Sequence, residues 1–125
     1  FIPEQHHEQA RALRDDFLDG KHSLAAPALM PFEAVNALHY SGHYDGERLV
    51  EAATSLGEYG IELVGFQAVG PIAAVATAAD ITAYDAAYVA LASRRSGCVY
   101  TADRALVSDL EGTEYEDTVD HIETY

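Results

Sequence analysis

Three acidic side chains occupy positions where they could bind a metal ion together. Glu33 and Asp85 fall in the first turns of two predicted helices, and Asp103 directly follows a predicted strand. Ligands of open parallel sheets bind at the carboxyl ends of the strands, where the following helices begin. If the strands are parallel, the three carboxylates meet at one edge of the sheet. Such a group of oxygen ligands suits Mg²⁺ or Mn²⁺, and an ion held there can activate water for an in-line phosphoryl displacement.

Each of these acids also has a purely structural interpretation. Asp85 lies three residues after Thr82 and could complete a capping box at the start of its helix. Asp103 is a natural N-cap residue, and Glu33 would complement the dipole of its helix. The metal interpretation therefore depends on the three residues lying together.

Helical and strand patterns alternate along the chain, and these elements must position the acids. The predicted helices run from Pro3 to about Gly20 and over residues 31–40, 47–58, 71–78 and 83–95, with a short last helix after Asp103. The predicted strands are residues 23–26, 61–66 and 98–101, with a terminal edge strand over 119–125. Because strands separated by helices need crossover connections, the pattern predicts an α/β fold with a mainly parallel sheet.

The composition fits one compact domain over residues 1–125. Hydrophobic residues make up 49% of the chain, enough to bury a core. Its one cysteine, Cys98, excludes an internal disulfide framework and a multi-cysteine zinc site, and we expect it to be a structural thiol in a buried strand. Neither an apolar run of about 20 residues nor a signal peptide is found. We therefore expect a cytoplasmic protein that makes no membrane contact.

The charge balance is strongly acidic. Acidic residues number 21 against 7 basic ones, for a net charge of −14, and Lys21 is the one lysine. An evenly acidic, lysine-poor chain is similar to proteins of salt-loving organisms such as halophilic archaea, in which salt screens the self-repulsion. The alternative is an ordinary acidic protein. No basic patch indicates a DNA-binding module, although a nuclease could contact phosphates through bound metal ions.

Three sequence blocks resemble motifs of a known family. They are Pro-Phe-Glu-Ala-Val-Asn-Ala-Leu at residues 31–38, the block containing Tyr-Asp-Ala-Ala-Tyr-Val-Ala-Leu-Ala at 81–92, and the block containing Thr-Ala-Asp at 99–106. In this order and spacing they are similar to the three downstream motifs of PIN-domain proteins, and within that family to the VapC toxins of toxin–antitoxin pairs. The similarity covers nearly the whole chain.

The resemblance implies a metal-dependent endoribonuclease on a three-layer α/β/α fold with a mainly parallel central sheet. Glu33, Asp85 and Asp103 match the family's second, third and fourth metal-coordinating acids, which hold Mg²⁺ or Mn²⁺. Thr101 matches a small hydroxyl residue near the metal, and Asn36 lies one turn beyond Glu33 on the same helix face. The implied partners are an RNA substrate, a cognate antitoxin that covers the acidic pocket, and a second copy in a homodimer.

One part of the family pattern is not found in this chain. The family's first acid stands on a central N-terminal strand, which would precede Pro3, so we expect the sheet to lack that strand. An alternative function is a non-catalytic PIN-fold scaffold or RNA-binding subunit. A phosphoacceptor receiver domain is disfavoured, because it needs a lysine at a strand end and Lys21 lies next to Gly20.

The arginines near the motifs have two interpretations. Arg94, Arg95 and Arg104 could contact RNA phosphates beside the acidic site. The alternative is that they pair with the abundant acids on the protein surface.

Overall fold

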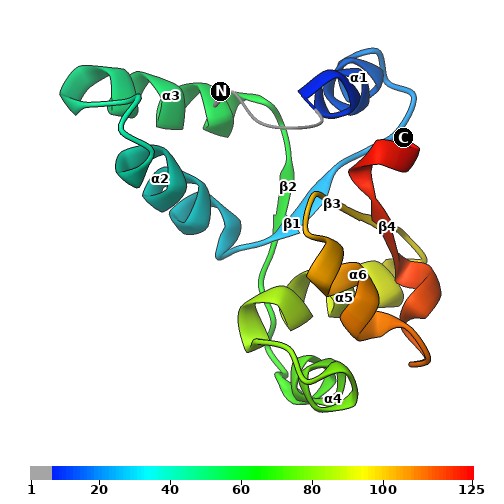
Figure 1. Ribbon diagram of the computed structural model, residues 1–125. Helices are drawn as coiled ribbons and strands as arrows, with labels where there is room; N and C mark the ends of the chain where they lie inside the picture. Colours follow the sequence, from blue (N-terminus) through cyan, green and yellow to red (C-terminus); the bar gives the residue numbers. More distant parts are fainter. Residues whose placement is uncertain (1–6) are drawn as a thin grey trace.

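The protein is an α/β chain in which short strands alternate with longer helices (Figure 1). The structure is a computed structural model and describes residues 7–125, so Pro3, predicted to begin the first helix, lies outside the described residues. The helices are α1 His7–Leu18, α2 Met30–Tyr40, α3 Gly46–Glu58, α4 Gly70–Ala79, α5 Ala83–Arg95 and α6 Arg104–Leu110. The strands are β1 Ala25–Pro27, β2 Glu62–Val64, β3 Val99–Thr101 and β4 Val119–His121. Two 3₁₀ turns, Glu116–Thr118 and Ile122–Thr124, flank β4.

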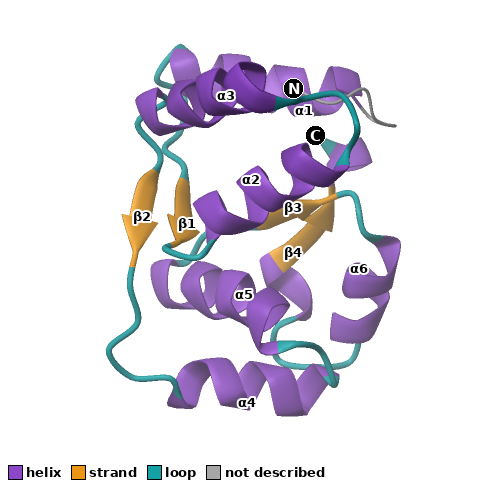
Figure 2. Ribbon diagram, turned by 90° about the vertical axis from the view of Figure 1, so that its left-hand side faces the viewer, coloured by secondary structure: helices purple, strands orange, loops and turns teal. Residues whose placement is uncertain are grey.

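Within the described residues the strands form two small sheets, whereas the sequence pattern predicted a single, mainly parallel sheet without the family's central N-terminal strand. β1 pairs with β2 and β3 pairs with β4, both in parallel, as predicted for strands joined by helices (Figure 2). A pocket of about 500 Å³ lies between the two pairs, lined by Ala25 of β1, Val99 and Tyr100 of β3, and Leu91 and Ala92 of α5. The pocket therefore separates the two sheets, and both sheets pack against the same helix, α5.

Helix α5 is the centre of the core and packs against β1, β3 and α4. Its buried side chains are Ala86, Ala87, Val89, Ala90, Leu91 and Ala92. Since most of these are alanine, neighbouring backbones can approach α5 closely, and the larger side chains come from the surrounding elements. The main buried cluster consists of Val75, Ala79, Ala86, Val89, Ala90, Leu106, Leu110 and Val119.

The helix starts near the predicted site are fixed by side-chain caps. Thr82 accepts the backbone N–H of Asp85 at 3.1 Å at the start of α5. The carboxylate of Asp103 accepts the backbone N–H groups of Ala105 and Leu106 at 2.9 and 3.4 Å at the start of α6. The structural interpretation of Asp103 as an N-cap is thus confirmed.

The observed strands are shorter than the sequence pattern predicted. The segment predicted over residues 61–66 is a strand only at β2, and the one predicted over 119–125 ends at His121. There the chain turns into a 3₁₀ helix, because the His121 ring accepts the backbone N–H of Glu123 and the His121 carbonyl accepts the Thr124 hydroxyl. These local bonds replace a continued sheet ladder.

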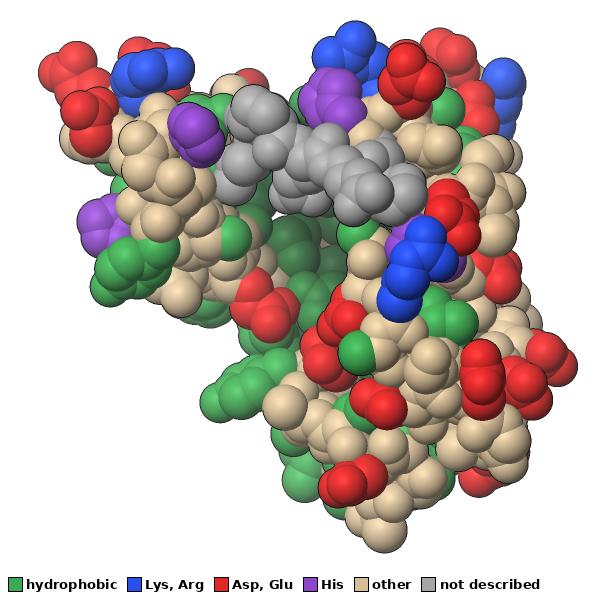
Figure 3. Space-filling model, viewed as in Figure 1, with side chains coloured by type: hydrophobic (Ala, Val, Ile, Leu, Met, Phe, Trp, Pro, Cys, Tyr) green, Lys and Arg blue, Asp and Glu red, His purple; other side chains and the backbone are tan. Residues whose placement is uncertain are grey.

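Acidic side chains are spread over much of the face seen in Figure 3, with fewer basic groups among them. In the described part of the chain, no helix combines the length and apolar character that crossing a bilayer requires.

Candidate functional site

Glu33 and Asp85 line one pocket of about 420 Å³. Glu33 comes from the first turn of α2 and Asp85 from the first turn of α5, and Thr101 at the end of β3 lines the same pocket. Its other lining residues are Met30, Ala34, Tyr88, Val99, Tyr100 and Leu106. The structure therefore brings two of the three predicted acids together at the carboxyl end of a parallel strand.

A tyrosine outside the predicted site residues, Tyr88, orients one of these acids. The Tyr88 hydroxyl donates a hydrogen bond of 2.6 Å to Oε1 of Glu33. The pKa of Tyr88 is raised well above its ordinary value, mainly by burial and secondly by the bond to Glu33. Its phenol therefore stays protonated and remains a donor. Tyr88 lies three residues after Asp85 on α5, a spacing that places both on one helix face and could have indicated the contact.

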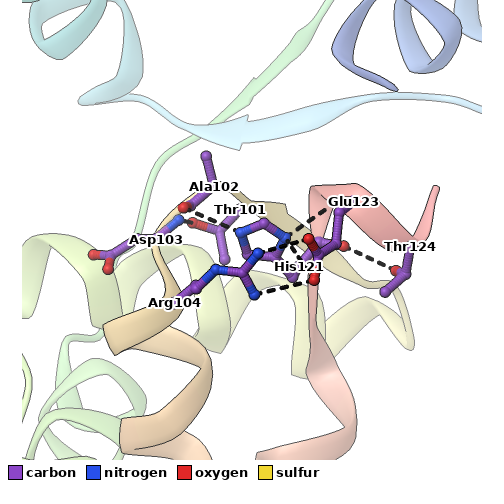
Figure 4. Close-up of polar contacts among 7 residues, drawn as sticks. All are labelled: Thr101, Ala102, Asp103, Arg104, His121, Glu123 and Thr124. Carbon is purple, nitrogen blue, oxygen red and sulfur yellow. Dashed lines mark hydrogen bonds and ion pairs between the residues drawn. The ribbon is translucent and has the colours of Figure 1, made fainter. Parts of the chain in front are cut away.

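Asp103 does not line this pocket. Its side chain is exposed, caps α6, and points away from His121 and Glu123 (Figure 4). Thr101, two residues earlier, does line the pocket, and its Oγ1 accepts the backbone N–H of Asp103 at 3.0 Å. Asp103 is thus tied to the pocket through Thr101, although its carboxylate is not part of the lining.

The donor chemistry of the pocket fits the predicted ions, while the ligand number is smaller than predicted. Glu33 and Asp85 supply carboxylate oxygens and Thr101 a hydroxyl, which are ligands that Mg²⁺ and Mn²⁺ prefer. Across residues 7–125, no group of three or more His, Cys, Asp or Glu side chains is arranged to hold a metal ion. Asn36, the other predicted supporting residue, is exposed on α2 and does not line the pocket.

The three arginines lie outside this pocket. Arg95 forms an ion pair with Glu62, and Arg104 forms two hydrogen bonds with Glu123, of 3.0 and 2.6 Å. Surface pairing, one of the two interpretations, is therefore confirmed for these two residues. Arg94 instead places its guanidinium 5.3 Å from the ring centroid of Phe66, in a separate pocket.

The expectation that Cys98 lies in a buried strand was wrong. Cys98 immediately precedes β3 and is exposed. Its Sγ lies 3.4 Å from a carboxylate oxygen of Asp120, on the neighbouring strand β4. The pKa of Cys98 is raised from 9.0 to about 11, mainly by desolvation and secondly by this hydrogen bond.

We expect Cys98 to react slowly with an alkylating reagent despite its exposure. At pH 8, its raised pKa lowers the thiolate fraction about a hundredfold, and the greater nucleophilicity of a more basic thiolate recovers part of this. The rate with iodoacetamide should then be about tenfold below that of an unstructured cysteine peptide. In Asp120→Asn, the rate of Cys98 should be closer to that of the peptide. Equal rates for the wild-type protein and the peptide would contradict the raised pKa.

The fold and the pocket together define an α/β protein with parallel strands and paired acids at helix starts. No family model matches the chain, and no curated protein matches it. Among solved structures, the chain is similar to PAE2754 from Pyrobaculum aerophilum, with a TM-score of 0.68 and 23% identity over 94% of this chain and 84% of that one. At this identity the likeness shows a shared fold.

Proposed function

We propose that this protein is a metal-dependent endoribonuclease of the PIN-domain family, similar to the VapC toxins of toxin–antitoxin pairs. The observation that carries the proposal is the pocket shared by Glu33, Asp85 and Thr101. These residues belong to three separate blocks that resemble the family's motifs, and they converge at the carboxyl end of a parallel strand. The family resemblance further implies an RNA substrate, a cognate antitoxin and a homodimer, and the acidic composition with its one cysteine favours a cytoplasmic, salt-adapted setting.

Glu33, Asp85 and Asp103 would hold the Mg²⁺ or Mn²⁺ ion, which when bound supplies an activated water for attack on a phosphodiester. The surrounding residues orient the three carboxylates. Tyr88 holds one oxygen of Glu33, and Thr82 fixes the turn of α5 that carries Asp85. Asp103 has one oxygen engaged by the first turn of α6, so its other oxygen is the one available to an ion.

The three-layer α/β/α arrangement is part of the same proposal. The family's N-terminal strand is central in its sheet and carries a further acid. The pocket between β1 and β3 offers a strand edge on each side and α5 beneath, so a strand parallel to both could join the two pairs into one sheet. Its carboxyl end would then lie beside the pocket of Glu33 and Asp85.

The test is cleavage of end-labelled RNA in molar KCl, by the chain alone and by the chain extended with the family's N-terminal strand. We expect the extended chain to cut with Mn²⁺, and to stop cutting with EDTA or with Asp103→Asn. Cutting that persists in EDTA would contradict the metal mechanism.

A non-catalytic scaffold is the second candidate. It is favoured because two of the three carboxylates already have protein partners: Glu33 accepts from Tyr88, and Asp103 caps α6. A folded extended chain that retains RNA, binds no Mn²⁺ and cuts nothing would establish this function in place of the nuclease.

A further inference from the structure

The peptide group that joins Ala102 to Asp103 is held at both ends by side chains. Its N–H, which belongs to Asp103, donates to Oγ1 of Thr101 at 3.0 Å. Its carbonyl, which belongs to Ala102, lies 3.2 Å from Nε2 of His121 (Figure 4). Thr101 and His121 are register partners on β3 and β4, so two neighbouring strands hold this one peptide group between them.

The hydrogen bonds of His121 fix its tautomer. Nδ1 lies 3.2 Å from the backbone N–H of Glu123, which can only donate, so Nδ1 accepts. The neutral ring then carries its proton on Nε2, and that proton is donated to the Ala102 carbonyl, which can only accept. His121 is 6% exposed, and both bonds are partly buried.

A second contact ties the same parts of the chain together. Arg104, which directly follows Asp103, binds both carboxylate oxygens of Glu123 in a fork at 3.0 and 2.6 Å. This pair is mostly exposed, so its own contribution is small, but it keeps the turn after β4 against the start of α6.

We propose that His121 is a positioning residue for Asp103. Holding both ends of the preceding peptide group fixes the rotation of its plane, and this sets the direction in which the Asp103 side chain leaves the backbone. His121 acts on the carbonyl end and Thr101 on the N–H end. The functional meaning of this geometry rests on the proposed nuclease, whereas the geometry itself can be tested without it.

Two substitutions of His121 separate its two bonds. In His121→Gln, the side-chain amide nitrogen can occupy the place of Nε2 and donate to the Ala102 carbonyl. In His121→Asn, the shorter side chain can still accept from Glu123 in the place of Nδ1, but it does not reach Ala102.

Thr101→Val and Thr101→Ser form a second pair acting on the other end, because valine loses the hydroxyl and serine keeps it. His22→Gln is the matched control, since His22 contacts Tyr125 in the same C-terminal segment.

The first measurement is amide hydrogen exchange at Ala105 and Leu106, whose N–H groups bind the Asp103 carboxylate. We expect His121→Asn and Thr101→Val to speed exchange there about tenfold, with the Val89 amide in the core of α5 unchanged. His121→Gln, Thr101→Ser and His22→Gln should stay within about twofold of the wild type. Equal acceleration at Val89 would indicate general destabilisation and would overturn the proposal, as would wild-type exchange in His121→Asn.

The second measurement is Mn²⁺ affinity by electron paramagnetic resonance on the extended chain. We expect a loss of about tenfold for His121→Asn and recovery in His121→Gln, as for other residues that orient a metal ligand. A wild-type protein that binds no Mn²⁺ would refute the proposed nuclease, and hydrogen exchange would still decide whether His121 positions Asp103. Mn²⁺ binding that is unchanged in His121→Asn would overturn the role of His121 at the site.

Discussion

Replacing Glu33 by glutamine or Asp85 by asparagine is expected to lower metal-dependent RNA cleavage about a thousandfold. Each change removes one of the two carboxylate charges that line the pocket and keeps the shape of the side chain. Several kcal/mol of charge stabilisation in the transition state depend on a correctly held ion, and each factor of ten in rate corresponds to about 1.4 kcal/mol. The measurement is single-turnover cleavage of end-labelled RNA with Mn²⁺.

Both variants should fold normally, so the loss of rate can be assigned to the site. The Tyr88 hydroxyl can still donate to the amide oxygen of glutamine at position 33, and Thr82 accepts a backbone N–H that Asp85→Asn retains. Glu47→Gln is the matched control, because Glu47 is an acid in the first turn of α3 and does not line the pocket. Rates of Glu33→Gln and Asp85→Asn equal to that of Glu47→Gln would refute the pocket as the active site.

Replacing Leu110 by alanine is expected to lower the free energy of unfolding by about 3 kcal/mol. Leu110 is 0% exposed at the end of α6 and belongs to the main buried cluster. The cost combines the lost burial of its side chain with the cavity left behind. For a domain with about 5 to 15 kcal/mol of stability, this is a large share. Urea denaturation followed by circular dichroism measures the change.

Leu18→Ala is the comparison, because it makes the same chemical change at a side chain that is 58% exposed. We expect it to alter the free energy of unfolding by less than about 0.5 kcal/mol. If the two variants lost equal stability, the burial of Leu110 in the main cluster would be wrong.

The helices could be predicted from the sequence because their signals are local. The start of α5 follows from Thr82 and the start of α6 from Asp103, both of which cap the helix through bonds to residues two or three positions away. The pocket could be predicted in part for a related reason. Strands that alternate with helices are parallel, which places Glu33, in the helix after β1, at the same edge as Thr101, which ends β3.

The remaining features depend on contacts between distant residues. The bond from Tyr88 to Glu33 spans 55 positions, and that from His121 to Ala102 spans 19. The helical and strand patterns of the sequence do not reveal either bond. The division of the strands into two sheets likewise depends on which edges meet in space, and Cys98 is exposed because it precedes β3, where the strand ladder has not begun.

The separated strand pairs also affect how copies of this protein behave together in solution. Each strand of the two pairs has one edge unpaired within the described residues, and an open strand edge is a template for pairing with another chain. The net charge of −14 opposes such association at low ionic strength by mutual repulsion. At molar salt the range of that repulsion shrinks to about 3 Å, so charge no longer protects the edges against aggregation. In concentrated brine, protection of these open edges therefore depends on a strand or a partner that covers them, and not on charge.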